Sequence, residues 1–309
     1  MAMKIKDYLD QDQIKYFTAK SDVQALWLLL INWLGVIALF SMVSIWTNPL
    51  TITLAIILLA GRMLGLSVLM HECGHRTFFK SAKVNYFVGQ WLCATLTFND
   101  LDTFANEHKV HHQKVGTLSD PNLENYRAYP VEKASFTRKM YRDITGRTGF
   151  KLIVFIINNV FCLFDKTRRA LAFPALKILW AQCLFAIVLG LLFAPWMYLI
   201  WLATQMTTFM VVVRIRQIAE HGAVPRLLNA DPRESTRTTI PTWWERIVIA
   251  PNYVNYHVEH HFMSSVPCYK LKELHQLLKR KGAYKKMHIP QSYGEVVRTV
   301  IKPAELTLG

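Results

Sequence analysis

Two long stretches of the chain contain no charged side chain and are dominated by hydrophobic residues. They cover residues 23–61 and 178–213. Because a helix needs ~20 residues to cross a hydrocarbon core of ~30 Å, each stretch is long enough for two passes. Pro49 and Pro195 interrupt the stretches, and proline disrupts a helix because it lacks the backbone N–H donor. The pattern predicts two helical hairpins, with spans at about 23–46, 50–70, 175–194 and 196–213.

Composition supports a membrane protein and narrows its class. Of the 309 residues, 52% are hydrophobic, and the net charge is +15. Lys and Arg crowd the polar segments that flank the spans, as expected for segments that face an anionic cytoplasmic leaflet. The sequence shows no nucleic-acid motif, so the charge does not indicate a nucleic-acid partner. Five cysteines without a CxxC pair indicate no disulfide framework, which fits a reducing cytosolic face.

We therefore expect an all-α integral membrane protein with one main domain. Residues 1–22 are charged and precede a full-length span, so they form a cytosolic N-terminal segment rather than a cleavable signal peptide. Residues 23–309 form the single domain. The hairpin turns are short and uncharged, which places the polar segments 71–174 and 214–309, together with both termini, in a helical cap on the cytosolic face. The membrane would be a bacterial inner membrane or the membrane of the endoplasmic reticulum.

The histidines gather at four places, which hold nine of the eleven in the chain. They are His71 and His75; His108, His111 and His112; the single His221; and His257, His260 and His261. Residues three and four apart share one face of a helix, so each cluster can direct its imidazoles at one point. Neutral imidazole is the commonest metal ligand and suits iron, copper, zinc and nickel. The clusters together predict a metal centre.

A shared metal centre constrains how the chain crosses the membrane. The apolar segments 84–98 and 150–164 hold about 15 residues each, which is short for a span. If either segment crossed the bilayer, histidine clusters would lie on opposite faces of the membrane. We therefore expect both segments to be interfacial or re-entrant, and residues 269–281 to form an amphipathic helix of the cap.

The first cluster also matches the zinc protease signature H-E-x-x-H, in His71-Glu72-Cys73-Gly74-His75. Catalytic zinc takes three protein ligands and a water, and nine histidines exceed that need. They suit two metals with four or five ligands each. Two irons held by histidine can activate O₂ and attack an unactivated C–H bond, which zinc cannot do because it has no redox chemistry. An intramembrane zinc protease and a non-catalytic metal-binding membrane protein remain alternatives.

The pattern of HxxxH, HxxHH and a second HxxHH, with an extra histidine before the last, resembles the membrane fatty acid desaturase family. Three flanking features strengthen the resemblance: Phe78-Phe79 after the first cluster, Ser119-Asp120-Pro121 after the second, and the stretch from His257 to Pro267. The resemblance covers roughly residues 50–282. It implies desaturation of a lipid acyl chain, with a hydroxylase or ketolase of an alkyl chain, sphingolipid or carotenoid as the alternative on the same scaffold.

The same resemblance implies two iron ions, with O₂ as co-substrate. The implied ligands are His71, His75, His108, His111, His112, His221, His257, His260 and His261. Gln217 stands where relatives place an asparagine that holds a water on one iron. Carboxylates next to the ligands could accept hydrogen bonds from their N–H groups; the candidates are Glu72, Glu107, Asp120, Glu220 and Glu259. His275 and His288 are expected at the surface or in packing. Electrons would come from a separate acidic donor, either an iron–sulfur ferredoxin or a cytochrome b5.

Overall fold

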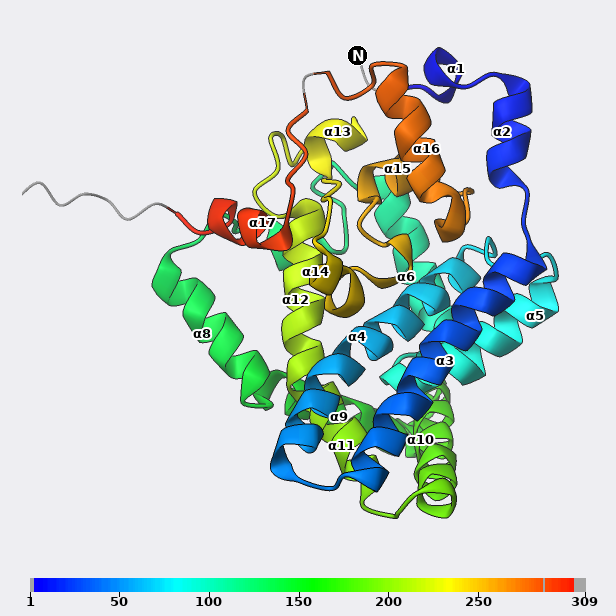
Figure 1. Ribbon diagram of the computed structural model, residues 1–309, viewed down its shortest axis with the longest axis vertical. Coiled ribbons are helices and arrows are strands. Elements are labelled where there is room, and N and C mark those ends of the chain that lie inside the picture. The colour runs from blue at the N-terminus through cyan, green and yellow to red at the C-terminus, as the bar shows by residue number, and fades with distance from the viewer. Residues whose placement is uncertain (1–2, 286, 303–309) are drawn as a thin grey trace, which may run out of the picture.

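The computed structural model describes residues 3–285 and 287–302, and it is built from helices. Within that part of the chain, the β-type pairing is an isolated bridge between Val131 and Ile301. Long helices gather at one end of the molecule, and short helices cover the other end (Figure 1). The all-α prediction is confirmed. The prediction that both termini face the cytosol concerns chain ends that lie outside the described residues.

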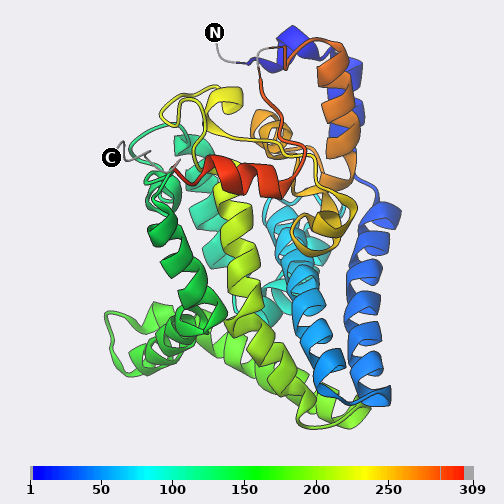
Figure 2. The ribbon, with the colours of Figure 1, turned by 60° about the vertical axis from the view of Figure 1, so that its left-hand side comes forward.

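The first predicted hairpin consists of α3 (Asp22–Ile45) and α4 (Pro49–Gly74), which lie side by side in both ribbon views (Figures 1 and 2). The Asn48 side chain accepts hydrogen bonds from the backbone N–H groups of Leu50 and Thr51, at 3.0 and 3.1 Å. Pro49 occupies the first helical position, where its missing donor breaks no intrahelical bond. The turn that the sequence predicts near Pro49 is therefore a capped helix start.

The second hairpin contains α10 (Ala172–Leu192), α11 (Met197–Met206) and α12 (Thr208–His221). The sequence predicts one span over 196–213, but non-helical angles at Thr207 (φ −119°, ψ −89°) divide this segment into two helices. Gly149 packs on the break, since a Cβ at this glycine would lie 2.4 Å from the Met206 Cα. Beyond residue 213, α12 continues to His221 and so carries that side chain out to the cap.

Five helical segments are long and apolar enough to cross a membrane: Asp22–Ile45, Pro49–Gly74, Arg147–Phe164, Arg169–Leu192 and Met197–His221. The third contains α9 (Arg147–Phe161) and η3 (Cys162–Phe164), where the sequence predicts an interfacial or re-entrant helix. The apolar segment 84–98 is not among the five, because it is divided into α5 (Ala82–Phe87), the π-helix η1 (Val88–Ala94) and η2 (Thr95–Thr97). The chain is therefore an integral membrane protein with several membrane-length helices.

The cap is assembled from short helices that precede the first hairpin or follow either hairpin. They are α1 (Ile5–Tyr8), α2 (Gln11–Thr18), α6 (Leu101–Lys114), α7 (Leu123–Tyr126), α8 (Lys133–Ile144), α13 (Pro232–Ser235), α14 (Trp243–Val248), η5 (Pro251–Tyr253), α15 (His257–Phe262), α16 (Cys268–Arg280) and α17 (Tyr293–Thr299). The short turn η4 (Arg169–Leu171) instead leads directly into α10. The predicted amphipathic helix is α16, which buries Leu271, Leu274 and Leu278 on one face.

Polar side chains fix this cap to the first hairpin. Asn252 of η5 inserts between α3 and α4: it donates to the Gly65 carbonyl at 2.9 Å and accepts from Asn32 at 3.1 Å. Arg62 of α4 donates to the Ile247 carbonyl at 2.8 Å. Gly61 lets α14 approach, since a Cβ there would lie 2.4 Å from that same carbonyl oxygen. Small residues and interhelical hydrogen bonds are the usual means of close packing in a membrane, where apolar burial discriminates little.

Candidate metal centre

Four helix ends deliver the clustered histidines to one place. His71 lies in the last turn of α4 and His75 caps that helix, while α6 carries His108, His111 and His112. His221 is the last residue of α12, and the short helix α15 carries the third cluster. Because α4 and α12 pack against each other, and α6 packs against α4, the clusters meet although they are far apart in sequence.

The larger group of imidazoles comes from three helices. His71, His75, His108, His112 and His260 each place one ring nitrogen so that all five atoms lie within 4.8 Å of one another. The His108 Nε2 lies 2.8 Å from His71 Nε2 and 3.0 Å from His112 Nε2. Two nitrogens that bind one ion at ~2.1 Å and at right angles lie roughly 3 Å apart. The spacing therefore matches nitrogens directed at a shared ion.

The second group consists of His111, His221 and His261, whose ring nitrogens also lie within 4.8 Å of one another. His257 joins it, since its Nε2 lies 2.9 Å from His221 Nε2 and 3.0 Å from His261 Nε2. The two groups are adjacent, because the rings of His112 and His261 stack with centroids 4.4 Å apart. All nine histidines singled out in the sequence are brought together.

Burial keeps these rings in the form that binds metal. Desolvation lowers the pKa of His75 to about 4, and it lowers the pKa of His108 with a further contribution from the neighbouring His71. A neutral imidazole offers a nitrogen lone pair. The Nε2 of His75 is buried and has no hydrogen-bond partner among the described residues. A metal ion would satisfy this otherwise unpaired atom, so the residues fit a metal centre.

The backs of several rings are held by oxygen acceptors. Asp120 accepts from His111 Nδ1–H at 2.8 Å, and Glu72 from His71 Nδ1–H at 3.1 Å. Burial alone would raise the pKa of Asp120, but hydrogen bonds from His111 and Tyr126 outweigh it and leave the pKa below its usual value. Such contacts fix the tautomer that leaves Nε2 free for a metal. The candidate roles of Asp120 and Glu72 as acceptors agree with these contacts.

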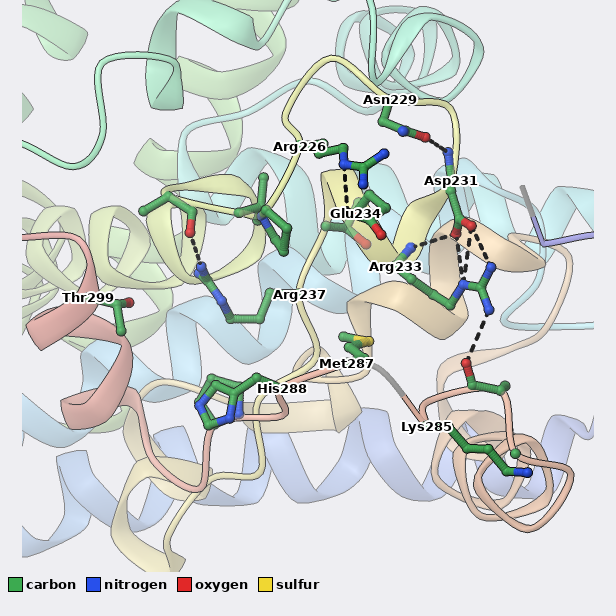
Figure 3. Close-up of a pocket in the computed structure, with 17 residues that line it drawn as sticks. Arg226, Asn229, Asp231, Arg233, Glu234, Arg237, Lys285, Met287, His288 and Thr299 are labelled. Atoms are coloured by element: carbon green, nitrogen blue, oxygen red, sulfur yellow. Dashed lines mark hydrogen bonds and ion pairs between the residues drawn. The ribbon is translucent and has the colours of Figure 1, made fainter. Parts of the chain in front are cut away.

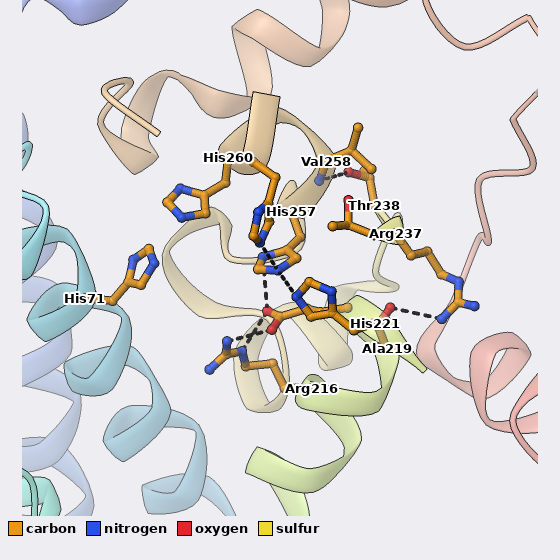
Figure 4. Close-up of polar contacts among 12 residues, drawn as sticks. His71, Arg216, Ala219, His221, Arg237, Thr238, His257, Val258 and His260 are labelled. Atoms are coloured by element: carbon orange, nitrogen blue, oxygen red, sulfur yellow. Dashed lines mark hydrogen bonds and ion pairs between the residues drawn. The ribbon is translucent and has the colours of Figure 1, made fainter. Parts of the chain in front are cut away.

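Glu220 forms part of a buried ionic network behind His257 (Figure 4). Arg216 donates to Glu220 Oε1 at 2.7 Å and to Oε2 at 2.6 Å, and Oε1 lies 3.6 Å from His257 Nδ1. Since the pair is a bidentate guanidinium–carboxylate contact, it holds both side chains in a fixed orientation. Glu220 therefore lies where it can orient His257.

The segment that follows α12 supports the centre from the other side. The Ser235 carbonyl accepts from His221 Nδ1–H at 3.1 Å. Arg237 donates to the carbonyls of Ala219 and Ala223, at 3.1 and 2.8 Å, and so caps the carboxyl end of α12 (Figure 4). A cation at that end of a helix stabilises its unpaired carbonyl groups. Only the unusual density of Ser, Thr and Arg over 235–239 hints at this role in the sequence.

Two other candidate acceptors, Glu259 and Glu107, form no hydrogen bond with the nine clustered histidines, all of which lie in the described part of the chain. Glu259 accepts from Thr238 Oγ1–H, His275 Nδ1–H and Tyr284 O–H at 2.5–2.6 Å, and its partners lie outside the nine clustered histidines. It therefore ties α15 to α16 instead of orienting a candidate ligand. Glu107 is exposed and makes no ion pair within the described residues, as expected for an ordinary surface carboxylate.

The remaining candidates lie at the edge of the centre. Gln217 is partly exposed one turn before His221 on α12, and no hydrogen bond of its side chain is found within the described residues. His275 is buried in packing against Tyr256, whereas His288 is 73% exposed and contacts Glu295 at 2.7 Å. Both outcomes agree with the expected surface or packing roles.

Two cavities reach the histidines from different directions. One, of about 260 Å³, is lined by His71, His257 and His260 and continues between α4 and α12. The other, of about 460 Å³, is lined by His75, His108 and His112 together with polar residues of the cap. The centre thus has a largely apolar approach from the spans and a polar approach from the cap.

Asp120 provides a test of how the centre is supported. Replacing it by Ala removes the acceptor for His111, and loss of such a contact weakens metal binding about 10- to 100-fold. We expect the Asp120→Ala variant to lose bound metal at correspondingly lower chelator concentration, as measured by elemental analysis after dialysis. Glu107→Ala is the matched control because that carboxylate is exposed. Equal retention of metal by the two variants would show that Asp120 does not support the centre.

Comparison with known proteins shows which family has this sequence pattern. The sequence profile described as "Fatty acid desaturase" matches residues 47–293. The chain is 24% identical to the dihydrorhizobitoxine desaturase of Bradyrhizobium elkanii over 79% of this chain and 71% of that protein. It is 29% identical to the sn-1 oleoyl-lipid 12-desaturase of a Synechocystis strain, over 70% of this chain and 64% of that protein. The match of the profile to most of the chain, including all four histidine positions, shows that the protein belongs to the fatty acid desaturase family of oxidoreductases.

Proposed function

We propose that this protein uses O₂ and a histidine-ligated di-iron centre to insert a double bond into a lipid acyl chain. The observation that carries the proposal is the convergence of nine imidazoles at the end of a cavity that runs between membrane-length helices. The candidate metal ligands therefore lie at the end of the cavity through which an apolar substrate would enter.

The ligand roles follow the two groups of rings. His71, His75, His108, His112 and His260 would hold one iron, and His111, His221, His257 and His261 the other. Gln217, longer by a methylene than the asparagine implied by the family resemblance, would reach its ion through a water. Bound there, the iron pair would supply the activation of O₂ and the removal of hydrogen from an unactivated C–H bond.

The cavity of about 260 Å³ has the lining that an acyl chain requires. Leu64, Val68 and His71 follow one face of α4, while Phe209, Val213 and Arg216 follow one face of α12. The apolar positions lie toward the middle of the spans, and the histidines lie at the cap. An acyl chain between these faces would have its reacting carbons beside His71, His257 and His260.

Desaturation is preferred over the other reactions open to this scaffold. The relatives described above are named as desaturases. A zinc protease would use Glu72 as a base facing a metal-bound water, but Glu72 accepts hydrogen bonds from His71, Thr77 and the Cys268 backbone N–H. These contacts support a role for Glu72 in orienting His71.

We also propose that the centre and both termini face the cytosol, with four helices crossing the membrane. The clusters that end α4 and α12 meet, so an even number of crossings separates them. The helices α10 and α11–α12 supply two, which leaves α9 at the membrane surface. The excess of Lys and Arg in the cap supports a cytosolic orientation.

The reaction requires an electron donor. Desaturation removes two hydrogens with their electrons from the chain, while reduction of O₂ to two waters consumes four electrons and four protons. Two electrons and two protons must therefore come from elsewhere in each turnover. We propose a separate one-electron carrier of the ferredoxin or cytochrome b5 type.

The metal content distinguishes this function from the zinc protease. We expect about two irons per chain in protein purified without chelator, since nine nitrogen ligands exceed what one ion uses. Elemental analysis by mass spectrometry measures this ratio. One tightly held zinc per chain, with no iron and full activity, would rule out the di-iron centre.

The product distinguishes desaturation from hydroxylation and ketone formation. Gas chromatography of lipids from a host that expresses the protein should show a new unsaturated acyl chain. The product should fall below detection in His111→Ala and His260→Ala variants, because each loses a metal ligand, while both variants still insert into the membrane. His288→Ala, an exposed histidine, is the matched control and should keep the product. Hydroxylated or keto lipids in place of the unsaturated chain would contradict desaturation.

The orientation has its own test. Reporter fusions after Asn48 and after Pro195 should lie outside the cytosol, while fusions after Lys114 and after Gly309 should lie inside. A fusion in the segment between α9 and α10, after Lys166, should also lie inside if α9 stays at the surface. Finding this last fusion outside would mean that α9 crosses the membrane, and the four-span arrangement would be wrong.

A further inference from the structure

The five-histidine group is partly open to the surface of the cap. Four of its members, His71, His75, His108 and His112, are intermediate in exposure, whereas two of the three histidines in the second group are buried. The opening is the cavity of about 460 Å³ lined by His75, His108 and His112. It shares His71 and Phe104 with the cavity between α4 and α12 but opens among residues of the cap, so a partner at the cap and an acyl chain in the spans would approach the centre from different sides.

The mouth of this cavity is positively charged. Its charged lining residues other than the histidines are Arg76 and Lys109, both exposed. Neither forms an ion pair with a carboxylate within the described residues. Their charges therefore remain available to a partner, next to the exposed edges of three candidate iron ligands.

Arg76 has an unusual backbone for its residue type. Its φ is +58°, in the left-handed region that glycine adopts most easily. The turn is set by hydrogen bonds from Arg76 N–H to the Cys73 carbonyl and from Thr77 N–H to the Glu72 carbonyl, each 3.0 Å long. A strained position at a functional opening points to a use for the side chain that occupies it.

A larger polar cavity of about 1070 Å³ lies elsewhere in the cap, and its three arginines are already engaged, which leaves Lys285 as its one cationic side chain without an ion pair among the described residues (Figure 3). Arg233 pairs with Asp231 at 2.6 Å, Arg226 approaches Glu234 at 3.7 Å, and Arg237 caps α12. None of the nine clustered histidines lines this cavity. It offers less free charge and a longer route to the metal centre.

We infer that the mouth formed by Arg76 and Lys109 is the docking surface for an acidic one-electron carrier protein, which delivers the electrons of the proposed desaturation. Electron transfer slows steeply with distance, so the carrier must approach an edge of a ligand ring, and the opening over His75, His108 and His112 provides such edges. An acidic carrier would be drawn there by electrostatic steering. In each turnover two carriers are oxidised by one electron each, and two protons enter with them to complete two waters. The inference rests on the proposed function.

The charge at the mouth can be removed without adding strain. Arg76→Gly places the residue best suited to φ +58° at this position, and Lys109→Gln alters an exposed side chain of α6. The double variant Arg76→Gly/Lys109→Gln is compared with Arg226→Gln/Lys285→Gln, which removes two charges from the larger cavity. Both are tested as full-length protein in detergent with bound iron. The first double variant is called the mouth variant and the second the control variant. If the mouth variant loses iron, the single variant Lys109→Gln is measured in its place.

The probes are two acidic carriers, a reduced [2Fe–2S] ferredoxin and the reduced soluble domain of a cytochrome b5. Stopped-flow absorbance follows carrier oxidation in the presence of substrate and O₂ at several salt concentrations. With the carrier that works, the rate constant should fall about 10-fold or more in the mouth variant, and its salt dependence should flatten. The rate constant of the control variant should stay within about two-fold of the wild type. An unchanged rate constant in the mouth variant, or a larger fall of the rate constant in the control variant, would overturn the inference.

A second measurement separates failure of docking from failure of the function. Protein reduced anaerobically with stoichiometric dithionite and then mixed with O₂ needs no carrier. The wild type and both variants should then form the unsaturated product in a single turnover. Absence of product from the wild type would refute the proposed desaturation. Product in all three proteins, with carrier oxidation insensitive to the mouth charges, would refute only the docking surface.

Discussion

The packing of neutral imidazole nitrogens at 2.8–3.0 Å from one another is the constraint on which the rest of the cap depends. His71 and His221 direct Nδ1–H at oxygen acceptors, so their Nε2 atoms carry lone pairs toward neighbouring rings. Nitrogens directed at one point in this way can share one metal ion. The fold therefore has to hold four helix ends in place, and the contacts of Asp120, Glu72 and Ser235 with the backs of the rings serve that purpose.

The membrane boundary divides the supply of reactants to the centre. The cavity between α4 and α12 is continuous with the apolar spans, whereas the cavity over His75, His108 and His112 opens among polar cap residues. A hydrocarbon chain and a water-soluble reductant have opposite solubilities, so separate approaches allow both to reach one site. The break at Thr207 contributes to this arrangement, because α12 can follow a different direction from α11 and still carry His221 to the centre.

The features that depend on local sequence could be predicted, and those that depend on long-range contacts could not. Charge-free length locates the hairpins, and histidine spacing identifies the nine side chains that converge. The break at Thr207 has no proline or glycine to mark it, and Gly149, which packs there, lies far away in sequence. Arg237 and Ser235 gain their roles only because their loop passes the end of α12. Five apolar segments also satisfy length and composition where the sequence predicts four spans, since neither property fixes orientation.

Glu72 and Glu259 show why a short motif does not determine a mechanism. Both glutamates adjoin candidate ligands, and Glu72 completes a zinc protease signature. In the fold, Glu72 accepts from the Cys268 backbone N–H at 2.8 Å and so joins the end of α4 to the start of α16. Glu259 joins α15 to the same helix through His275, and to the segment that follows it through Tyr284. Since α16 is held by both, the two carboxylates set the third histidine cluster relative to the first. A glutamate whose carboxylate oxygens already accept several hydrogen bonds is poorly placed to act as a base. It contributes to the reaction by holding the neighbouring imidazoles in position.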